Sequence, residues 1–324
     1  MNRYLFSKFI ALLSGICLIF IAIGHNKDTL YEINGNAYGT TWSVKSSDYI
    51  SDEHYNKIKL IIKNIDFIAS NYKENSEIGI ININNPTEQV ISDDLYEILS
   101  IAKEVELISE GFYNIMLGKV SSNLGFSPNF GKTLNQESAS NYELKNNLLI
   151  KNSSNWFDLS SIAKGYAVQK IHEYLIENNF FNHLIDIGGE LIAYGKNNEN
   201  PWNVGIQNPN TINESPVLIL SNDILNFMAI ATSGEYRNFL ISNDGQKITH
   251  SINPKTLKSV KNNLLSVTVV HENSSTHADA LATAFNVMGK DKALSVANNN
   301  NLAIMLITDS NEIYFSNKWY DLKL

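Results

Sequence analysis

Helical and strand-like patterns follow one another in this chain without regular alternation. A doubly wound fold would require strands and helices in strict turn, so the order excludes that class. We instead expect an α+β fold with mixed or largely antiparallel sheets and packed helices. The apolar spacing predicts helices over 52–65, 92–108, 160–178, 278–287 and 292–297, and strands over 31–45, 184–191, 202–207, 228–232, 265–272 and 302–308.

The first 24 residues read as a targeting segment, not as part of the fold. Arg3 and Lys8 precede an apolar run from Phe9 to Ile23. The run has about 15 apolar residues, and a membrane span needs ~20, which favours an export signal over a permanent N-terminal anchor. Residues 12–17 partly match a lipoprotein box ending in Cys17, so lipidation is a further alternative. Because the positive flank stays inside, we expect the rest of the chain on the outer face of the inner membrane, in the periplasm.

Composition excludes several classes of function for residues 25–324. The net charge of −8 would oppose nucleic-acid binding, because no basic face offsets phosphate repulsion. The only cysteine is Cys17, so this part of the chain has no disulfide and no thiolate site. No internal repeat or low-complexity linker divides the chain, and we expect one continuous body.

The most informative segment is 157–166, where two serines lead into a helical pattern. Ser160 or Ser161 is a good N-cap for a helix that starts there. Asp158, the serines and Lys164 would then gather at a helix N-terminus, whose free N–H groups suit a phosphate. The oxygen atoms of Asp158 and the serines could instead hold a hard cation. The alternative is a capped structural helix with a surface lysine.

A second candidate site lies at 278–283. Asp279 and Thr283 are four residues apart, so on a helix they share one face. A carboxylate and a hydroxyl are hard oxygen donors that fit Mg²⁺. The alternative is that Asp279 caps the helix and Thr283 bonds back to its own backbone.

A third segment, 249–256, holds one histidine in a polar turn. His250 can act as a general base near neutral pH, or be only a hydrogen-bonding loop residue. No two histidines have zinc-site spacing, and neither a Gly-x-Ser-x-Gly elbow nor a Walker-type loop occurs.

Taken together, these segments resemble the ApbE family of FAD:protein FMN transferases. The resemblance extends from about residue 36 to 308 and depends on nine pieces in the family's order. They are 38–44, Tyr72 with 75–77, 111–114, 158–165, 187–190, 202–206, 231–236, 250–256 and 278–283.

The resemblance implies a defined reaction. FAD would bind with Mg²⁺ across its pyrophosphate, and a threonine or serine hydroxyl of a target protein would attack the FMN phosphorus. AMP would leave, and FMN would stay attached through a phosphoester bond. The implied targets are exported or membrane redox flavoprotein subunits.

The resemblance also implies roles for particular residues. Ser161, Asp279 and Thr283 would hold the metal, and His250 would take the proton from the target hydroxyl. The chain departs from the family pattern at Asn253 and at Leu257, where a glycine is usual and a different turn is expected. Asn114 is a third departure. The residues implied to contact FAD are Tyr38, Tyr72, Phe112, Tyr113, Asn114, Asp158, Lys164 and Ile252.

Two other functions remain as alternatives. An FAD pyrophosphatase would use the same metal site, with water in place of the protein hydroxyl, and release free FMN and AMP. A non-catalytic exported flavin-binding protein would leave FAD intact.

Overall fold

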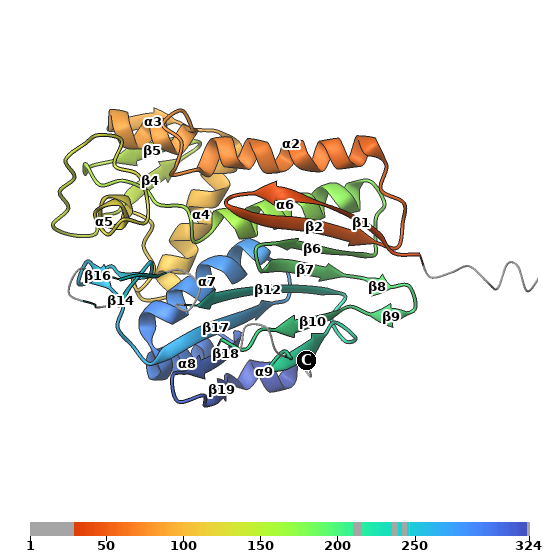
Figure 1. The fold of residues 1–324 in the computed structure, drawn as a ribbon. Coiled ribbons are helices and arrows are strands. Elements are labelled where there is room, and N and C mark those ends of the chain that lie inside the picture. The colour runs from red at the N-terminus through yellow and green to blue at the C-terminus, as the bar shows by residue number, and fades with distance from the viewer. Residues whose placement is uncertain (1–28, 210–214, 235–238, 242–244, 246, 323–324) are drawn as a thin grey trace, which may run out of the picture.

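The computed structural model describes residues 29–209, 215–234, 239–241, 245 and 247–322. The predicted targeting segment, 1–24, lies outside the described residues. A sheet of eight strands forms the centre of the molecule, and every neighbouring pair is antiparallel (Figure 1). Its order is β1 (Tyr31–Ala37), β2 (Thr40–Ser46), β6 (His183–Ile187), β7 (Glu190–Tyr194), β12 (Phe227–Gly234), β17 (Leu264–His271), β18 (Ala303–Thr308) and β19 (Ile313–Phe315).

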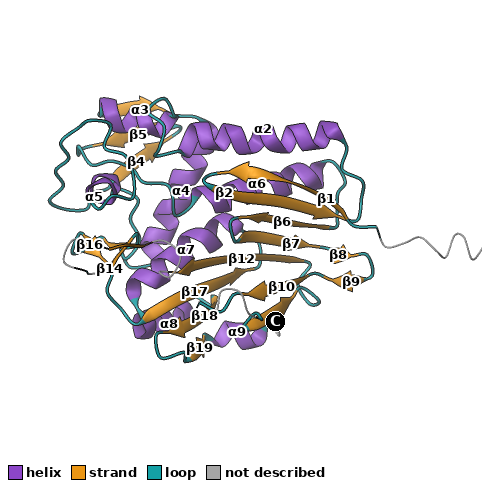
Figure 2. Ribbon diagram, in the orientation of Figure 1, coloured by secondary structure: helices purple, strands orange, loops and turns teal. Residues whose placement is uncertain are grey.

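Both faces of this sheet are covered, which explains why its central strands are apolar on both sides. Figure 2 shows the strands lying side by side as one layer. One face packs against α2 (Asp52–Ala69), α4 (Asp93–Ile108), α6 (Ala163–Glu177), α7 (Ser275–Met288) and α8 (Lys290–Asn299). The other face packs against β10 (Asn203–Ile206), β11 (Leu218–Ser221) and α9 (Asn317–Asp321). The predicted α+β class with antiparallel sheets is therefore confirmed.

Smaller elements surround this centre. A three-stranded sheet lies with α3 and α5 beyond one end of the large sheet (Figure 1). The remaining elements are α3 (Glu77–Asn84), β3 (Glu88–Val90), α5 (Gly118–Asn123), β4 (Tyr142–Lys145), β5 (Leu148–Lys151), β8 (Lys196–Asn197), β9 (Asn200–Pro201), β13 (Phe239–Ile241), β14 (Lys247–Thr249), β15 (Ile252–Asn253) and β16 (Lys258–Ser259). No helix among the described residues has the length and apolar character needed to cross a membrane.

Two predictions of local structure were wrong. The strand expected over 31–45 is a hairpin, because Tyr38 and Gly39 both adopt positive φ, 53° and 74°, and form the two-residue turn between β1 and β2. The strand expected over 184–191 is also a hairpin, because Gly188 and Gly189 adopt positive φ, 64° and 102°, and form the turn between β6 and β7. A polar loop over 71–76 leads into α3, whose first turn is capped where Ser76 Oγ accepts from the Gly79 N–H at 2.9 Å.

Candidate functional site

The turn before α6 is organised by Asp158, not by a serine cap. Its Oδ1 accepts hydrogen bonds from the Ser160 N–H at 3.0 Å and from the Ser160 hydroxyl at 2.6 Å. The residue before the first turn of α6 is Ile162, which makes no side-chain cap. The predicted serine N-cap is therefore wrong: the Ser160 hydroxyl is bonded to the aspartate, and that of Ser161 lies against a tyrosine.

The first turn of α6 is satisfied by a carboxylate from α7. The Gly165 N–H donates to Asp279 Oδ2 at 2.8 Å, and the Ser275 hydroxyl donates to the Gly165 carbonyl at 2.7 Å. A Cβ on Gly165 would lie 2.4 Å from the Ser275 carbonyl oxygen and 2.6 Å from Asp279 Cβ. A glycine is thus required for the two helices to approach closely enough for Asp279 to occupy a helix N-terminus.

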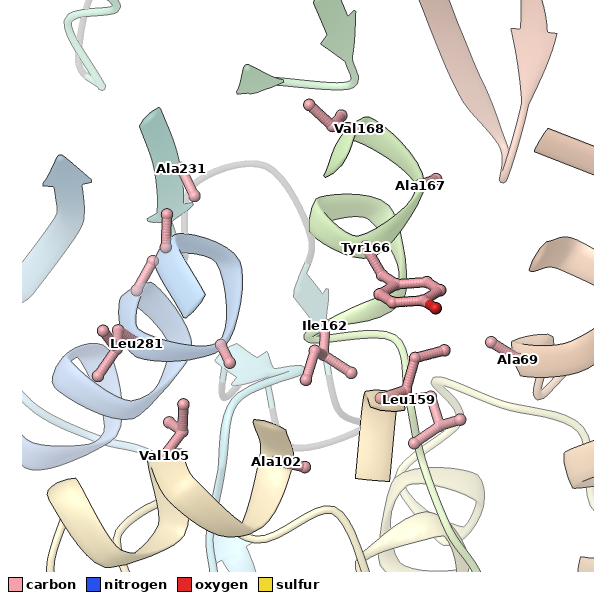
Figure 3. Packing of buried hydrophobic residues seen from close by; sticks show 14 of the residues in the cluster. Ala69, Ala102, Val105, Leu159, Ile162, Tyr166, Ala167, Val168, Ala231 and Leu281 are labelled. Carbon is pink, nitrogen blue, oxygen red and sulfur yellow. The ribbon is translucent and has the colours of Figure 1, made fainter. Parts of the chain in front are cut away.

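Buried apolar side chains fix the position of the same turn. Leu159 and Ile162 are fully buried on either side of the two serines. In the close view they lie among side chains from neighbouring helices, including Ala102 of α4 and Leu281 of α7 (Figure 3). The polar residues of the turn are therefore held on a rigid base.

A buried charged cluster lies beside this turn. The Lys164 ammonium is ion-paired with Glu190 Oε2, and the two side chains are 28% and 5% exposed. Burial raises the pKa of Glu190 to about 7, against the lowering effect of Lys164, and Asp279 raises it further. Burial also raises the pKa of Asp279, opposed by Lys164 and by the Gly165 N–H. The positive charge of Lys164 thus opposes the rise in pKa of two buried carboxyl groups.

Tyr113 shows that the predicted site residues converge. Its hydroxyl lies 3.0 Å from Ser161 Oγ, and its ring is buried. Burial raises the pKa of this phenol, and the nearby charges of Asp279 and Asp158 raise it further. Residues from three separate segments of the sequence therefore surround one point. Thr283 lies one turn further along α7 from Asp279.

Sequence reasoning missed two residues of this site, Asn71 and Glu190. The Asn71 amide donates to Asp158 Oδ1, and its own oxygen accepts from the Leu159 N–H at 3.3 Å. Asn71 is 8% exposed, although it belongs to a segment interpreted as a polar loop. The available signals were an asparagine beside Tyr72 and a glutamate directly after a glycine pair.

Tyr72 and His250 both contact Phe126. The Tyr72 hydroxyl donates to the Phe126 carbonyl at 2.6 Å, and the His250 ring packs edge-on against the Phe126 ring, with centroids 6.2 Å apart. Next to His250, the Ser251 hydroxyl accepts from the Asn286 amide at 3.0 Å, which ties this segment to α7. Tyr72 is 65% exposed and available to a ligand.

The other predicted contacts are more dispersed. Tyr38 donates its hydroxyl to the Ile62 carbonyl at 2.7 Å, on α2. Asn114 uses its amide within the protein, donating to Glu106 Oε1 at 2.8 Å and accepting from the Met116 N–H at 2.8 Å. Their contact with FAD stays a prediction.

A large cavity is lined by residues other than those of the charged cluster. Its volume is about 790 Å³, which lies in the range of small-molecule sites. Phe112, Asn253 and Leu257 line it, while buried Ile252 packs with Leu117 beside it. The neighbours of Phe112 and Asn253 in sequence, Tyr113 and Ile252, are predicted FAD contacts. Of the predicted FAD contacts, Phe112 is the one that the described residues place in the cavity wall.

Leu257 stands where the family usually has a glycine, and its backbone is left-handed. Leu257 has a φ of 57°, in the region that a glycine adopts without strain. The Lys255 ammonium, two residues earlier, lies 3.8 Å from the centre of the Phe112 ring. The turn thus places a cation against the cavity wall.

The oxygen atoms beside Asp279 fit a hard cation whose remaining ligands come from a substrate. Asp279 is 5% exposed, and among the described residues none donates a hydrogen bond to its Oδ1. Within the same described part of the chain, no three residues among His, Cys, Asp and Glu form a metal-binding group. A cation here would need hydroxyl oxygens, and phosphate or water to complete its shell, which is the usual condition of Mg²⁺.

The chain is similar to known proteins over most of its length. The model of the ApbE family matches residues 38–306. A FAD:protein FMN transferase of Haemophilus influenzae is 34% identical, over 91% of this chain and 92% of its own length. One from Escherichia coli K12 is 28% identical, over 87% of this chain and 85% of its own.

Solved structures show the same fold. The flavin transferase ApbE from Vibrio cholerae has a TM-score of 0.78 at 24% identity, over 90% of this chain and 99% of that one. The ApbE protein of Thermotoga maritima has a TM-score of 0.80 at 22% identity, over 91% of this chain and 100% of that one.

Proposed function

Since this chain belongs to the ApbE family and is a transferase, we propose that it moves FMN from FAD to a hydroxyl group of a target protein. The observation that carries the proposal is the junction of α6 and α7. There Asp279 caps α6 through Gly165, next to Ser161 and to the paired Lys164. This is a place for a dianionic pyrophosphate and its cation.

Ser161, Asp279 and Thr283 would hold Mg²⁺. When bound, Mg²⁺ neutralises charge on the phosphates and on the oxygen that leaves. The role of the protein is mainly positioning. Lys164 offers an ammonium to a phosphate oxygen, and exposed Tyr72 offers its ring to FAD.

The bond changes are simple. The threonine or serine oxygen of the target forms a bond to the FMN phosphorus, and the pyrophosphate P–O bond breaks with its electrons leaving on AMP. His250, held against Phe126, accepts the hydroxyl proton. Because Asn286 binds Ser251, the position of this histidine is coupled to α7. In-line placement of the two oxygens provides most of the acceleration.

We also propose that the protein acts outside the cytoplasm. The charged and apolar pattern of residues 1–24 supports export to the periplasmic face of the inner membrane, as a cleaved, anchored or lipidated protein. Exported or membrane redox flavoproteins are then the accessible targets. Fractionation of cells that produce the full chain tests this, and a cytoplasmic pool alone contradicts it.

The test of function is covalent transfer. The full chain is incubated with FAD, Mg²⁺ and a candidate target domain, and the target is weighed by mass spectrometry. We expect a mass increase equal to FMN minus water, lost when the acceptor threonine is replaced or when EDTA is present. Free FMN released without any target would indicate a pyrophosphatase, and intact FAD after hours would indicate a binding protein.

A further inference from the structure

We propose that Glu190 is a positioning residue that holds the Lys164 ammonium toward the phosphates of FAD and away from Asp279. The proposal rests on the proposed function, since it concerns the same pyrophosphate site. Its basis is the arrangement of one cation between two buried carboxylates. Glu190 is paired with Lys164, while Asp279 is bonded to the residue that follows Lys164.

Without Glu190, the partly buried Lys164 has a competing partner. Asp279 already lies close enough for its charge to act on Glu190, and Lys164 acts on both acids. An ammonium that turned to Asp279 would occupy the carboxylate predicted to hold the cation. A charge held in a poorly solvated site seeks the nearest opposite charge, so a second acid is needed to keep Asp279 available.

The backbone fixes Glu190 firmly enough for this task. Glu190 is the first residue of β7 and pairs with Ile187 across the β6–β7 hairpin. The connecting glycines form a tight turn, and the Gly189 N–H donates to Asp186 Oδ1 at 2.9 Å. Because Lys164 is placed by the first turn of α6 and its tip is held by this hairpin, its flexible stem is ordered before the ligand arrives.

The first experiment compares FAD affinity in the full chain with and without this charge. Binding is followed by the change in flavin fluorescence in the presence of Mg²⁺, and transfer is measured alongside it. We expect Glu190→Gln to weaken FAD binding by about 10- to 100-fold, the range seen when partners of ligand-holding groups are removed. Glu190→Asp keeps the charge and should recover part of the loss. An unchanged Kd for Glu190→Gln overturns the proposal.

A double-mutant cycle separates positioning from a purely structural role. If Glu190 acts through Lys164, then Glu190→Gln changes FAD affinity less than about twofold in a Lys164→Met background. Equal losses in both backgrounds overturn the proposal. Glu173→Gln, which removes one of the two acidic partners of Lys170 further along the same helix, is the matched control and should leave binding unchanged.

Two further outcomes are distinguishable. If Glu190→Gln does not fold, Glu190→Asp carries the same cycle, with a smaller expected loss that again vanishes without Lys164. If the wild-type chain binds FAD but transfers nothing to any target, the proposed function fails. The fluorescence measurements still decide the role of Glu190 in that case.

Discussion

The proposed function gives Asp279 a structural and a chemical role in one carboxylate. One oxygen accepts a hydrogen bond from the first turn of α6, and the proposal assigns the other to a cation. Because both roles use the same side chain, a change that removes the charge but keeps the shape can separate them.

Asp279→Asn is the variant that makes this separation. Its amide oxygen can still accept from Gly165, so we expect a small change in melting temperature. The value of kcat/KM for transfer should fall by about 100-fold or more, because charge near the reacting phosphates is lost. Steady-state kinetics and a thermal melt measure the two effects. Asp291→Asn, on exposed α8, is the control, and equal activity of both variants would contradict the role of Asp279.

At this scale the sequence predicts contacts within one helix better than contacts between segments. Asp279 and Thr283 could be paired from their spacing alone, because four residues make about one helical turn. Asn71 could not be linked to Asp158, since 87 positions separate them and only the fold brings them together. Glu190 was missed for the same reason.

At the scale of elements, the contact of α6 with α7 depends on the absence of a side chain. Gly165→Ala would place a methyl group 2.4 Å from the Ser275 carbonyl oxygen. We expect the helices to separate, with a loss of about 1–3 kcal/mol in the free energy of unfolding and weaker FAD binding. Urea denaturation and fluorescence titration measure both. Glu177→Ala, exposed on the same helix, should change neither.

A buried histidine pair joins α6 to β6. His172 Nδ1 lies 2.9 Å from His183 Nε2, and His183 Nδ1 lies 2.9 Å from the Phe180 carbonyl. The carbonyl requires a proton on His183 Nδ1, so His172 donates to a neutral His183. Burial lowers the pKa of His172 to about 4 and that of His183 to about 3, from a usual 6.5.

These pKa values predict acid sensitivity. Below pH 6.5 the histidines bind protons in the unfolded chain but stay neutral in the folded chain. Their contribution to the free energy of unfolding is therefore fully present above pH 6.5 and falls as the pH decreases toward 4. The slope is up to about 1.4 kcal/mol per pH unit for each histidine. Urea midpoints at pH 7, 6 and 5 measure it. A His172→Phe/His183→Leu variant should show a shallower slope, although His271 still contributes; an equal slope would refute the assignment.

The elements themselves were only partly predictable. The starts of α2 and α4 were predicted within one residue, and there Ser51 and Ser92 accept a hydrogen bond from the N–H of the third residue beyond them. The hairpin turn at Tyr38 was not predicted, because a tyrosine rarely adopts positive φ. Leu257 is a similar case, in which packing with a small apolar cluster accompanies a strained backbone.

At the scale of the whole molecule, the site links segments that span most of the described chain. Asn71, Ser161, Glu190 and Asp279 come from four separate parts of the sequence, joined through one core. A ligand held by all of them should therefore stabilise the protein against global unfolding.

Thermal melts test this linkage. Mg²⁺ and FAD together should raise the melting temperature more than either alone, because each completes the binding site of the other. At 100 times Kd the gain is about 2.7 kcal/mol. Asp279→Asn should abolish the contribution of Mg²⁺. A shift with Mg²⁺ alone as large as that with both would argue against a shared site.

The strands of the large sheet stand in the same order across the sheet as along the chain. A polypeptide that arrives N-terminus first can add each strand to the edge left by the one before, and never needs to insert a late strand between two early ones. Asp279 comes after six of the eight strands, and only β18 and β19 still follow. A nascent chain should therefore not bind FAD until its last helices have packed onto the sheet.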